Sequence, residues 1–385
     1  MRAPSAAFAL LLALYAASAS AFVSPGLPAT YRTASHRCHQ TPKAHAPADD
    51  GAGEKQGRRA ALRRMQAVGG VVMVGEGLFG GLFGAKETVA STAPGGRTND
   101  VVGVVNGIKQ KLLGGSGIVV SEVGLGTQRW VSADFNAPDE REVFRMMDLA
   151  IRDGGVNLID TAEQYPIPSD DAHPEGLAEA TIGKWLATDK ALRAKTVIAT
   201  KIGGGQRISG KNIITACEDS LRRLGTDYID VYQFHWPARY TPQSNWGQSL
   251  SYRPEMERRS ATWEEQCIAM DKLYREGKIR GWGSCNDNAF GLTMLAETAR
   301  RLGTVPPCSF QNDFSVLNRR TEQDGLAEAS RPQHANAGFM AYNCLAGGVL
   351  TGKYLEVPAA VDDFGANPDR ARLSMKAPRG RMDDM

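Results

Sequence analysis

Between residues 121 and 345, short segments rich in β-branched and aromatic residues alternate with longer amphipathic segments. The short segments have the composition of buried strands, and the longer ones carry apolar residues at helical spacing. Strict alternation of this kind predicts a parallel sheet whose strands are connected by helices. The predicted strands lie within 121–127, 156–165, 196–201, 227–236, 279–286, 308–315 and 338–345, and the predicted helices within 139–155, 175–188, 212–226, 261–278, 289–303 and 321–330.

The number of strand–helix units distinguishes between the common parallel folds. An open dinucleotide-binding sheet has a G-x-G-x-x-G motif after its first strand, and no such motif follows residues 121–127. Seven or eight successive units fit a closed barrel better. We therefore predict a (β/α)8 TIM barrel within residues 101–385, with its chemistry at the carboxyl ends of the strands.

Four polar residues occur at that position on three successive predicted strands. Asp160 ends the second strand and Tyr165 follows it, Lys201 ends the third, and His235 ends the fourth. Each has a structural interpretation: a helix cap, a rim aromatic, a lysine reaching solvent, and a core histidine bonded to the backbone. Because all four fall at one topological position, an active site is the preferred interpretation.

The four side chains make a chemically coherent set. A phenol with a pKa of about 10 is a poor acid or base at neutral pH. A neighbouring ammonium, held by a carboxylate, is expected to lower that pKa, and an imidazole can orient a carbonyl group. The set can protonate an oxygen atom, but no side chain supplies a hydride, so a nicotinamide cofactor is implied.

Sequence blocks between about residues 113 and 380 resemble, in order, those of the aldo-keto reductase family. They are SEVGLGTQRW, NLIDTAEQYPIP, LRRLGTDYIDVYQFHWP, REGKIRGWGSCNDNAFG, QNDFSVLNR and CLAGGVLTGKYL. The bacterial Tas-like branch is the most similar, since it shares the AE-Y-P-P loop and the HWP sequence. The resemblance implies a TIM barrel of aldo-keto reductase type, with Tyr165 as general acid, Lys201 and Asp160 tuning it, and His235 orienting the carbonyl.

The resemblance also implies residues for the cofactor, NADPH, and for the substrate. The family holds the nicotinamide carboxamide with a Ser-Asn pair and a Gln, and here a cysteine replaces the serine, which weakens one hydrogen bond. Core packing remains an alternative for the stacking tyrosine at 342 and for the tryptophan at 236. The implied cofactor residues are Gly126, Thr127, Cys285, Asn286, Gln311, Tyr342, Asn343, Leu345, Gly347 and Lys353, and Trp130 and Trp236 are expected to wall the substrate pocket.

The barrel is expected to be truncated after its seventh strand. The last predicted strand is followed by GGVLTGKYL and a polar tail, where the family has an eighth strand and the pocket for the adenosine phosphate. An open seven-stranded barrel would expose two strand edges. An incomplete gene product is the preferred explanation, and closure of the gap by another chain is the alternative.

The N-terminal hundred residues are predicted to be a leader. Residues 1–22 have the apolar run and small residues of a signal peptide, and residues 23–100 resemble a transit peptide and disordered linker. Such a bipartite leader resembles those that target secondary plastids. The stroma is favoured, although RRAALRRMQAVGGVVMVGEGLFGGLFGA also permits a twin-arginine-like signal for the thylakoid lumen, or the end of the transit peptide. A stable membrane helix is not expected there.

The composition excludes several classes of function. Residues 1–100 hold 11 Lys and Arg against 6 Asp and Glu, whereas residues 101–385 hold 34 against 36, so the basic charge belongs to the leader. The predicted barrel therefore carries no charge pattern of a nucleic-acid-binding protein. The six cysteines lack C-x-x-C or metal-ligand spacing, which predicts reduced thiols and no metal site. Nothing in the sequence indicates an oligomeric state.

Two functions remain open from the sequence. The first is an NADPH-dependent oxidoreductase that reduces a small-molecule aldehyde or ketone to an alcohol. The alternative is a non-catalytic nucleotide-binding or regulatory barrel, similar to the channel β-subunits that share the family fold, made defective by the missing C-terminus. A barrel fragment that neither folds nor binds cofactor is a weaker third possibility.

Overall fold

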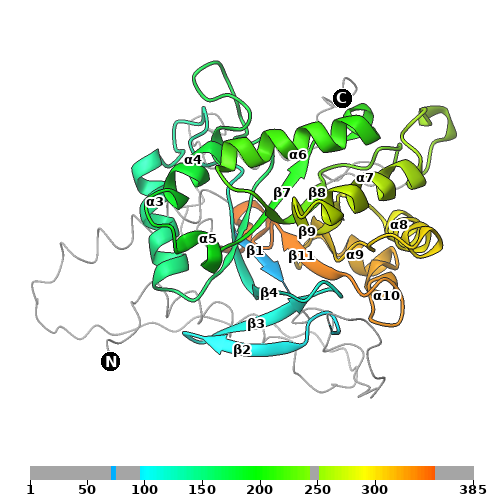
Figure 1. Ribbon diagram of the computed structural model, residues 1–385, viewed down its shortest axis with the longest axis horizontal. Coiled ribbons are helices and arrows are strands. Elements are labelled where there is room, and N and C mark those ends of the chain that lie inside the picture. Colours follow the sequence, from blue (N-terminus) through cyan, green and yellow to red (C-terminus); the bar gives the residue numbers. More distant parts are fainter. Residues whose placement is uncertain (1–70, 75–95, 243–250, 352–385) are drawn as a thin grey trace, which may run out of the picture. The chain divides into compact units, whose positions relative to one another are not determined.

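The computed structural model describes residues 71–74, 96–242 and 251–351. The predicted strands form seven consecutive parallel strands of one barrel, which confirms the fold class (Figure 1). Their pairing follows chain order from the first strand to the last, as expected for successive strand–helix units. They are β5 (Val123–Gly126), β6 (Leu158–Asp160), β7 (Val197–Ile202), β8 (Ile229–Phe234), β9 (Ile279–Cys285), β10 (Ser309–Asp313) and β11 (Gly338–Tyr342).

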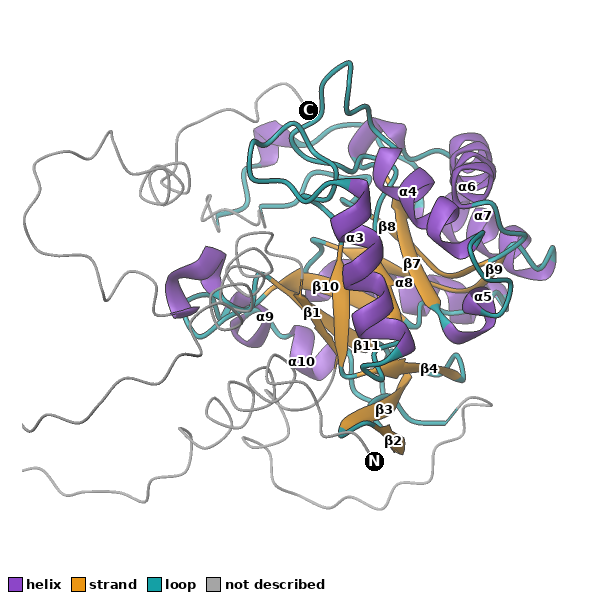
Figure 2. Ribbon diagram, turned by 90° about the vertical axis from the view of Figure 1, so that its left-hand side faces the viewer, coloured by secondary structure: helices purple, strands orange, loops and turns teal. Residues whose placement is uncertain are grey.

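The connecting helices cover the outside of the barrel wall, as the two ribbon views show (Figures 1 and 2). The predicted helix at 139–155 continues as a π-helical turn, η2 (Asp148–Arg152). The one predicted at 321–330 is divided because Gly325 adopts a φ of 83° between two short helices. The α-helices are α3 (Glu140–Met147), α4 (Leu177–Leu186), α5 (Leu192–Lys195), α6 (Gly210–Leu224), α7 (Trp263–Arg275), α8 (Ala289–Leu302), α9 (Arg320–Gln323) and α10 (Leu326–Ala329), with 3-10 turns at η3 (Gly205–Arg207), η4 (Pro254–Met256) and η5 (Ala346–Thr351).

The helix boundaries follow local sequence signals. The side chains of Asp139, Ser209, Thr262 and Asn288 each accept a hydrogen bond from a backbone N–H in the first turn of α3, α6, α7 and α8, respectively. The helices α6 and α8 both end at a glycine with left-handed backbone. These caps fix where each helix begins, and they therefore also fix where the preceding loop, which follows the end of a strand, stops.

An eighth strand closes the barrel from an unexpected part of the chain. Strand β1 (Val71–Val74) pairs antiparallel with both β5 and β11. The expectation of two exposed edges is therefore wrong, because β1 supplies hydrogen bonds to the first and the last parallel strand. These four residues lie in the segment predicted to be transit peptide and linker.

A second sheet covers the amino-terminal end of the barrel, and it was not predicted. It consists of β2 (Val101–Val105), β3 (Ile108–Leu113) and β4 (Ile118–Ser121), in that order (Figure 2). Asn106 and Gly107 form the first turn with φ values of 50° and 86°, so the Asn-Gly pair was the signal that could have predicted this hairpin. The hydrophobic core beneath the barrel is formed by Leu113, Ile118 and Val120 of this sheet with Leu158, Val197, Ala199, Val231, Cys308 and Met340.

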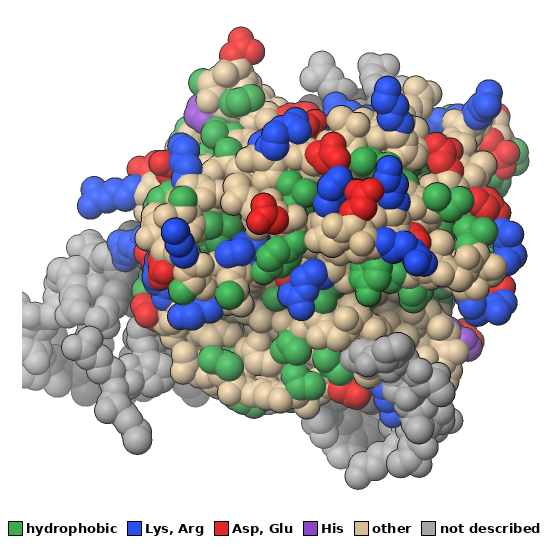
Figure 3. Space-filling view, viewed as in Figure 1, with side chains coloured by type: hydrophobic (Ala, Val, Ile, Leu, Met, Phe, Trp, Pro, Cys, Tyr) green, Lys and Arg blue, Asp and Glu red, His purple; other side chains and the backbone are tan. Residues whose placement is uncertain are grey.

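Lys and Arg side chains are interspersed with Asp and Glu on the helical face seen in Figure 3. Ion pairs also connect neighbouring helices, such as Arg301 on α8 with Glu264 on α7 and Lys184 on α4 with Glu140 on α3. This mixed pattern agrees with the near balance of charge in residues 101–385. Among the described residues, no helix is long and apolar enough to cross a membrane.

Candidate active site

The four polar residues predicted at the strand ends lie close together in the structure. The Lys201 Nζ atom lies 2.8 Å from Asp160 Oδ2 and donates a second hydrogen bond of 2.7 Å to the carbonyl oxygen of Thr161. The hydroxyl of Tyr165 lies 3.4 Å from His235 Nε2. The Lys201 ammonium is 5.2 Å from the centroid of the Tyr165 ring, so the two pairs form one cluster.

All four side chains are buried, and the lysine side chain has no exposed surface. A buried ammonium is stable only when it is paired and hydrogen-bonded, and Asp160 and the Thr161 carbonyl provide those interactions. The Thr161 carbonyl was missed from the sequence because every residue has one, and only the turn after β6 directs it at Lys201. The cluster is thus a fixed charge pair beside a phenol.

The pKa of Tyr165 is shifted in the direction opposite to the one expected. Burial raises it well above 10, with smaller contributions from the nearby Asp160 and Cys285. The expected lowering of this pKa is therefore not seen in the structure, because loss of hydration is the largest cause and the two smaller causes also raise the pKa. The phenol stays protonated at neutral pH, which is the form that a proton donor needs.

The pKa of His235 is well below 6.5, because burial and the positive charge of Lys201 both disfavour its protonation. The imidazole is therefore neutral at neutral pH. Its Nε2 atom lies beside the phenol, and its Nδ1 atom is buried without a hydrogen-bond partner. A neutral ring at this position can orient a hydroxyl or carbonyl oxygen without adding charge.

This neutral imidazole predicts an acid-sensitive fold. Below about pH 6.5 the unfolded chain binds a proton at His235 that the folded barrel does not, so the free energy of unfolding should fall by up to about 1.4 kcal/mol per pH unit down to the lowered pKa. Urea unfolding between pH 7 and pH 5 checks this, with His235→Gln as control. The variant should show a shallower pH dependence, and identical slopes would contradict the prediction.

Hydrogen bonds connect the four residues to several predicted cofactor residues. Gln311 on β10 donates from Nε2 to Asp160 Oδ1 at 2.8 Å and accepts at Oε1 from the Cys285 thiol at 3.4 Å. Burial raises the pKa of that thiol to about 12, so it remains a donor. Gln311 was predicted to hold the nicotinamide carboxamide, whereas in the structure both ends of its amide are engaged within the protein.

The amide of Asn286 lies between two other residues at the carboxyl ends of the strands. Its Nδ2 atom donates to the backbone carbonyl of His235 at 2.9 Å, and its Oδ1 atom accepts from the Tyr342 hydroxyl at 2.6 Å. Asn286 has a φ of 56°, which asparagine tolerates better than most residues. The ring of Tyr342 is half-buried, so it keeps an accessible surface beside this amide.

The loop after β11 is tightly curled. Asn343, Ala346, Gly347 and Gly348 all have positive φ, and Asn343 Oδ1 accepts a hydrogen bond of 2.7 Å from the N–H of Gly347. The Asn343 amide is in turn held by Asp313, a contact that the sequence did not reveal. Leu345 is partly exposed on this loop.

The remaining predicted residues are distributed around the same end of the barrel. Gly126 ends β5, and Thr127 follows it with a buried hydroxyl that has no hydrogen-bond partner. Trp130 is almost fully buried, whereas Trp236 is half-buried and its ring centroid lies 6.2 Å from that of His235. Lys353 lies outside the described residues.

These residues fit a nicotinamide cofactor. The donor set combines an amide, a half-buried aromatic ring and a curled backbone loop, and the Thr127 hydroxyl and the Nδ1 atom of His235 are buried without hydrogen-bond partners. Such a set suits a planar ring that carries a carboxamide. Among the described residues, no cluster of His, Cys, Asp or Glu has the arrangement of a metal site.

Comparison with known proteins shows the family. Residues 122–377 match the model of the aldo/keto reductase family, and the chain therefore belongs to that family of oxidoreductase enzymes, which act on small molecules. Protein tas of Escherichia coli is 37% identical over 273 residues, which cover 68% of this chain and 72% of that protein.

Two other relatives have less extensive matches. An aldo-keto reductase of Babesia bovis is 38% identical over 178 residues, which cover 42% of this chain and 62% of that protein. The uncharacterized oxidoreductase YrpG of Bacillus subtilis is 33% identical over 258 residues, which cover 63% of this chain and 68% of its own length. The predicted resemblance to Tas-like aldo-keto reductases is thus confirmed.

Proposed function

We propose that the protein is an NADPH-dependent reductase that converts an aldehyde or ketone to an alcohol. The observation that carries this proposal is the buried Lys201–Asp160 pair beside a protonated Tyr165. The hydroxyl of Tyr165 lies 3.4 Å from His235 Nε2. A fixed cation next to a buried acid is suited to donating a proton to a carbonyl oxygen. In line with the predicted leader, we place the enzyme in the plastid, with the stroma favoured.

Each of the four residues has a role in the proposed reaction. The bound nicotinamide would supply a hydride to the carbonyl carbon. Tyr165 donates its phenolic proton to the carbonyl oxygen, which becomes the hydroxyl of the alcohol. The resulting phenolate is stabilised by Lys201, and the neutral imidazole of His235 orients the carbonyl oxygen.

Two groups position these residues. Asp160 holds the Lys201 ammonium, and Gln311 in turn holds Asp160 by donating to its second carboxylate oxygen. We propose that Asn286, Tyr342 and the loop at Asn343–Gly348 hold the nicotinamide end of the cofactor. The closed barrel excludes water from the charge pair, which strengthens its electrostatic effect.

The test measures binding and turnover separately on the full chain. Quenching of tryptophan fluorescence by NADPH, with NADH in parallel, gives the two dissociation constants. Oxidation of NADPH is then followed by its absorbance with a panel of aliphatic, aromatic and α-keto carbonyl compounds, and the alcohol product is identified. Saturable binding with alcohol formation supports the proposal. Binding without turnover across the panel would favour the non-catalytic alternative, and no binding would refute a nucleotide-dependent function.

A further inference from the structure

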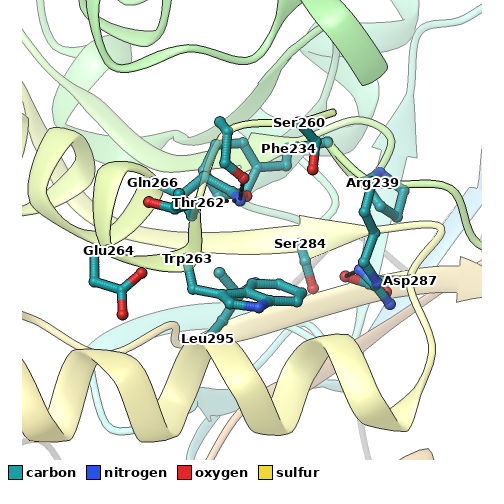
Figure 4. A pocket seen from close by; sticks show the side chains of 13 residues that line it. Phe234, Arg239, Ser260, Thr262, Trp263, Glu264, Gln266, Ser284, Asp287 and Leu295 are labelled. Atoms are coloured by element: carbon teal, nitrogen blue, oxygen red, sulfur yellow. Dashed lines mark hydrogen bonds and ion pairs between the residues drawn. The ribbon is translucent and has the colours of Figure 1, made fainter. Parts of the chain in front are cut away.

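A cavity of about 360 Å³ lies outside the barrel wall, between β8, β9 and the helices α7 and α8 (Figure 4). Its walls are mostly apolar and include Phe234, Trp263 and Leu295. The loop after β8 and the segment before α7 provide the remaining sides. Small-molecule sites in proteins begin at about this volume, and apolar cavities of less than half the size bind benzene.

This cavity is distinct from the candidate active site because the strands direct alternate side chains to opposite sides. On β8, Gln233 contacts Met340 across the barrel interior, so the next residue, Phe234, faces the helices. On β9, Cys285 bonds to Gln311 inside the barrel, so Ser284 faces outward. The two sites share the same strands but lie on opposite faces of the wall.

The charged groups that line the cavity are already paired. The guanidinium of Arg239 bonds to both carboxylate oxygens of Asp287, at 2.7 and 3.2 Å, and to Asn288 at 2.9 Å. It also lies over the Trp263 ring, with 5.1 Å between its Cζ atom and the ring centroid. Glu264 pairs with Arg301 on α8. The cavity therefore attracts neither an anion nor a cation strongly.

One buried side-chain oxygen in the wall lacks a hydrogen-bond partner. Ser284 is only 2% exposed, and its buried Oγ atom has no hydrogen-bond partner. In the close-up, Ser284 projects from β9 toward the space between Trp263 and Asp287 (Figure 4). A buried hydroxyl without a partner is unfavourable, and a ligand that supplies the missing hydrogen bond gains affinity from it.

We propose that this cavity is a second small-molecule site, which binds an uncharged aromatic compound that carries one hydroxyl or carbonyl group. The rings of Phe234 and Trp263 contact the apolar body of the ligand. The Ser284 hydroxyl bonds to its single polar group. This site is independent of the proposed reductase activity, because none of its residues belongs to the four polar residues at the barrel mouth.

The probes are chosen to test each part of this description. Binding of 2-naphthol, naphthalene and naphthalene-2-sulfonate to the full chain is measured by saturation-transfer NMR and by titration calorimetry. Wild type is expected to bind 2-naphthol more tightly than naphthalene, and both more tightly than the sulfonate. The Ser284→Ala variant should weaken binding of 2-naphthol about five- to tenfold, the effect of one hydrogen bond, and should leave naphthalene binding unchanged.

Two further variants separate this cavity from the barrel mouth. Leu295→Trp, or Ala261→Trp if the first does not fold, fills the cavity and should abolish binding of both neutral probes. Trp236→Ala alters the barrel mouth and should leave their binding unchanged. Absence of saturable binding to wild type, equal binding by the filled variants, or loss of binding in Trp236→Ala would each overturn the proposal.

Discussion

The Tyr165→Phe variant is expected to lower the kcat of carbonyl reduction by about 10²- to 10⁴-fold, the usual contribution of a general acid. The ring and its packing are retained, and the structure gives the hydroxyl one contact, with His235 at 3.4 Å. Folding and NADPH affinity should therefore change little. The measurement is NADPH oxidation with the best carbonyl substrate, together with fluorescence titration of the cofactor.

A second buried tyrosine provides a matched control. Tyr232 lies on β8 of the same barrel, is fully buried, and has a hydroxyl without a hydrogen-bond partner. Tyr232→Phe removes a hydroxyl of the same kind away from Lys201 and should leave kcat unchanged, with equal or slightly higher stability. Comparable kcat values for the Tyr165→Phe variant and wild type would rule out the proposed proton donor.

Removal of β1 is expected to produce the largest loss of stability. Its residues pair with Val123–Leu125 on one side and with Met340 and Ala341 on the other. Without β1, backbone N–H and C=O groups on the edges of β5 and β11 lose their hydrogen-bond partners. The buried side chains of Leu125 and Met340 then lie at an unpaired edge of the sheet. A chain that begins at residue 96 should lose about 3–6 kcal/mol, at roughly 1 kcal/mol per hydrogen bond with added apolar exposure.

Thermal unfolding followed by circular dichroism measures this effect. A loss of this size corresponds to a decrease in Tm of about 10–20 °C for a domain of this length. The control chain begins at residue 65, which keeps β1 within the same compact unit as the barrel, and it should unfold at the temperature of the full chain. If the chains that begin at residues 65 and 96 have the same Tm, β1 does not stabilise the barrel. The Val72→Pro variant provides a further check, since proline disrupts a strand that is paired on both sides without shortening the chain.

The alternation of strand and helix was enough to predict the parallel barrel, because each element carries its own periodicity and its own end signals. The same reasoning identified Asp160, Tyr165, Lys201 and His235, since the carboxyl ends of neighbouring parallel strands must lie at one end of the barrel. Their proximity required no information on individual contacts. The Asn106–Gly107 turn was an equally local signal for the sheet of β2, β3 and β4, although it was not used.

Other features depend on contacts between residues distant in sequence. Closure by β1 joins residues 71–74 to residues near 124 and 341, and no local pattern encodes that pairing. The raised pKa of Tyr165 depends on how completely the barrel excludes water, which composition does not reveal. The hydrogen bonds of Gln311 also depend on such contacts, because they join it to Asp160 and Cys285 on two other strands. The same is true of the cavity beside Ser284, which is lined by separate strands and helices.

The sequence by itself therefore determined the family, the order of the elements and the group of four polar residues, because these follow from local periodicity and from the position of each residue on its strand. Only the tertiary structure decided which strand closes the barrel, which proton states the buried groups hold, and where an unpartnered hydroxyl meets an apolar cavity. These properties depend on hydration and packing, which are set when distant parts of the chain come together.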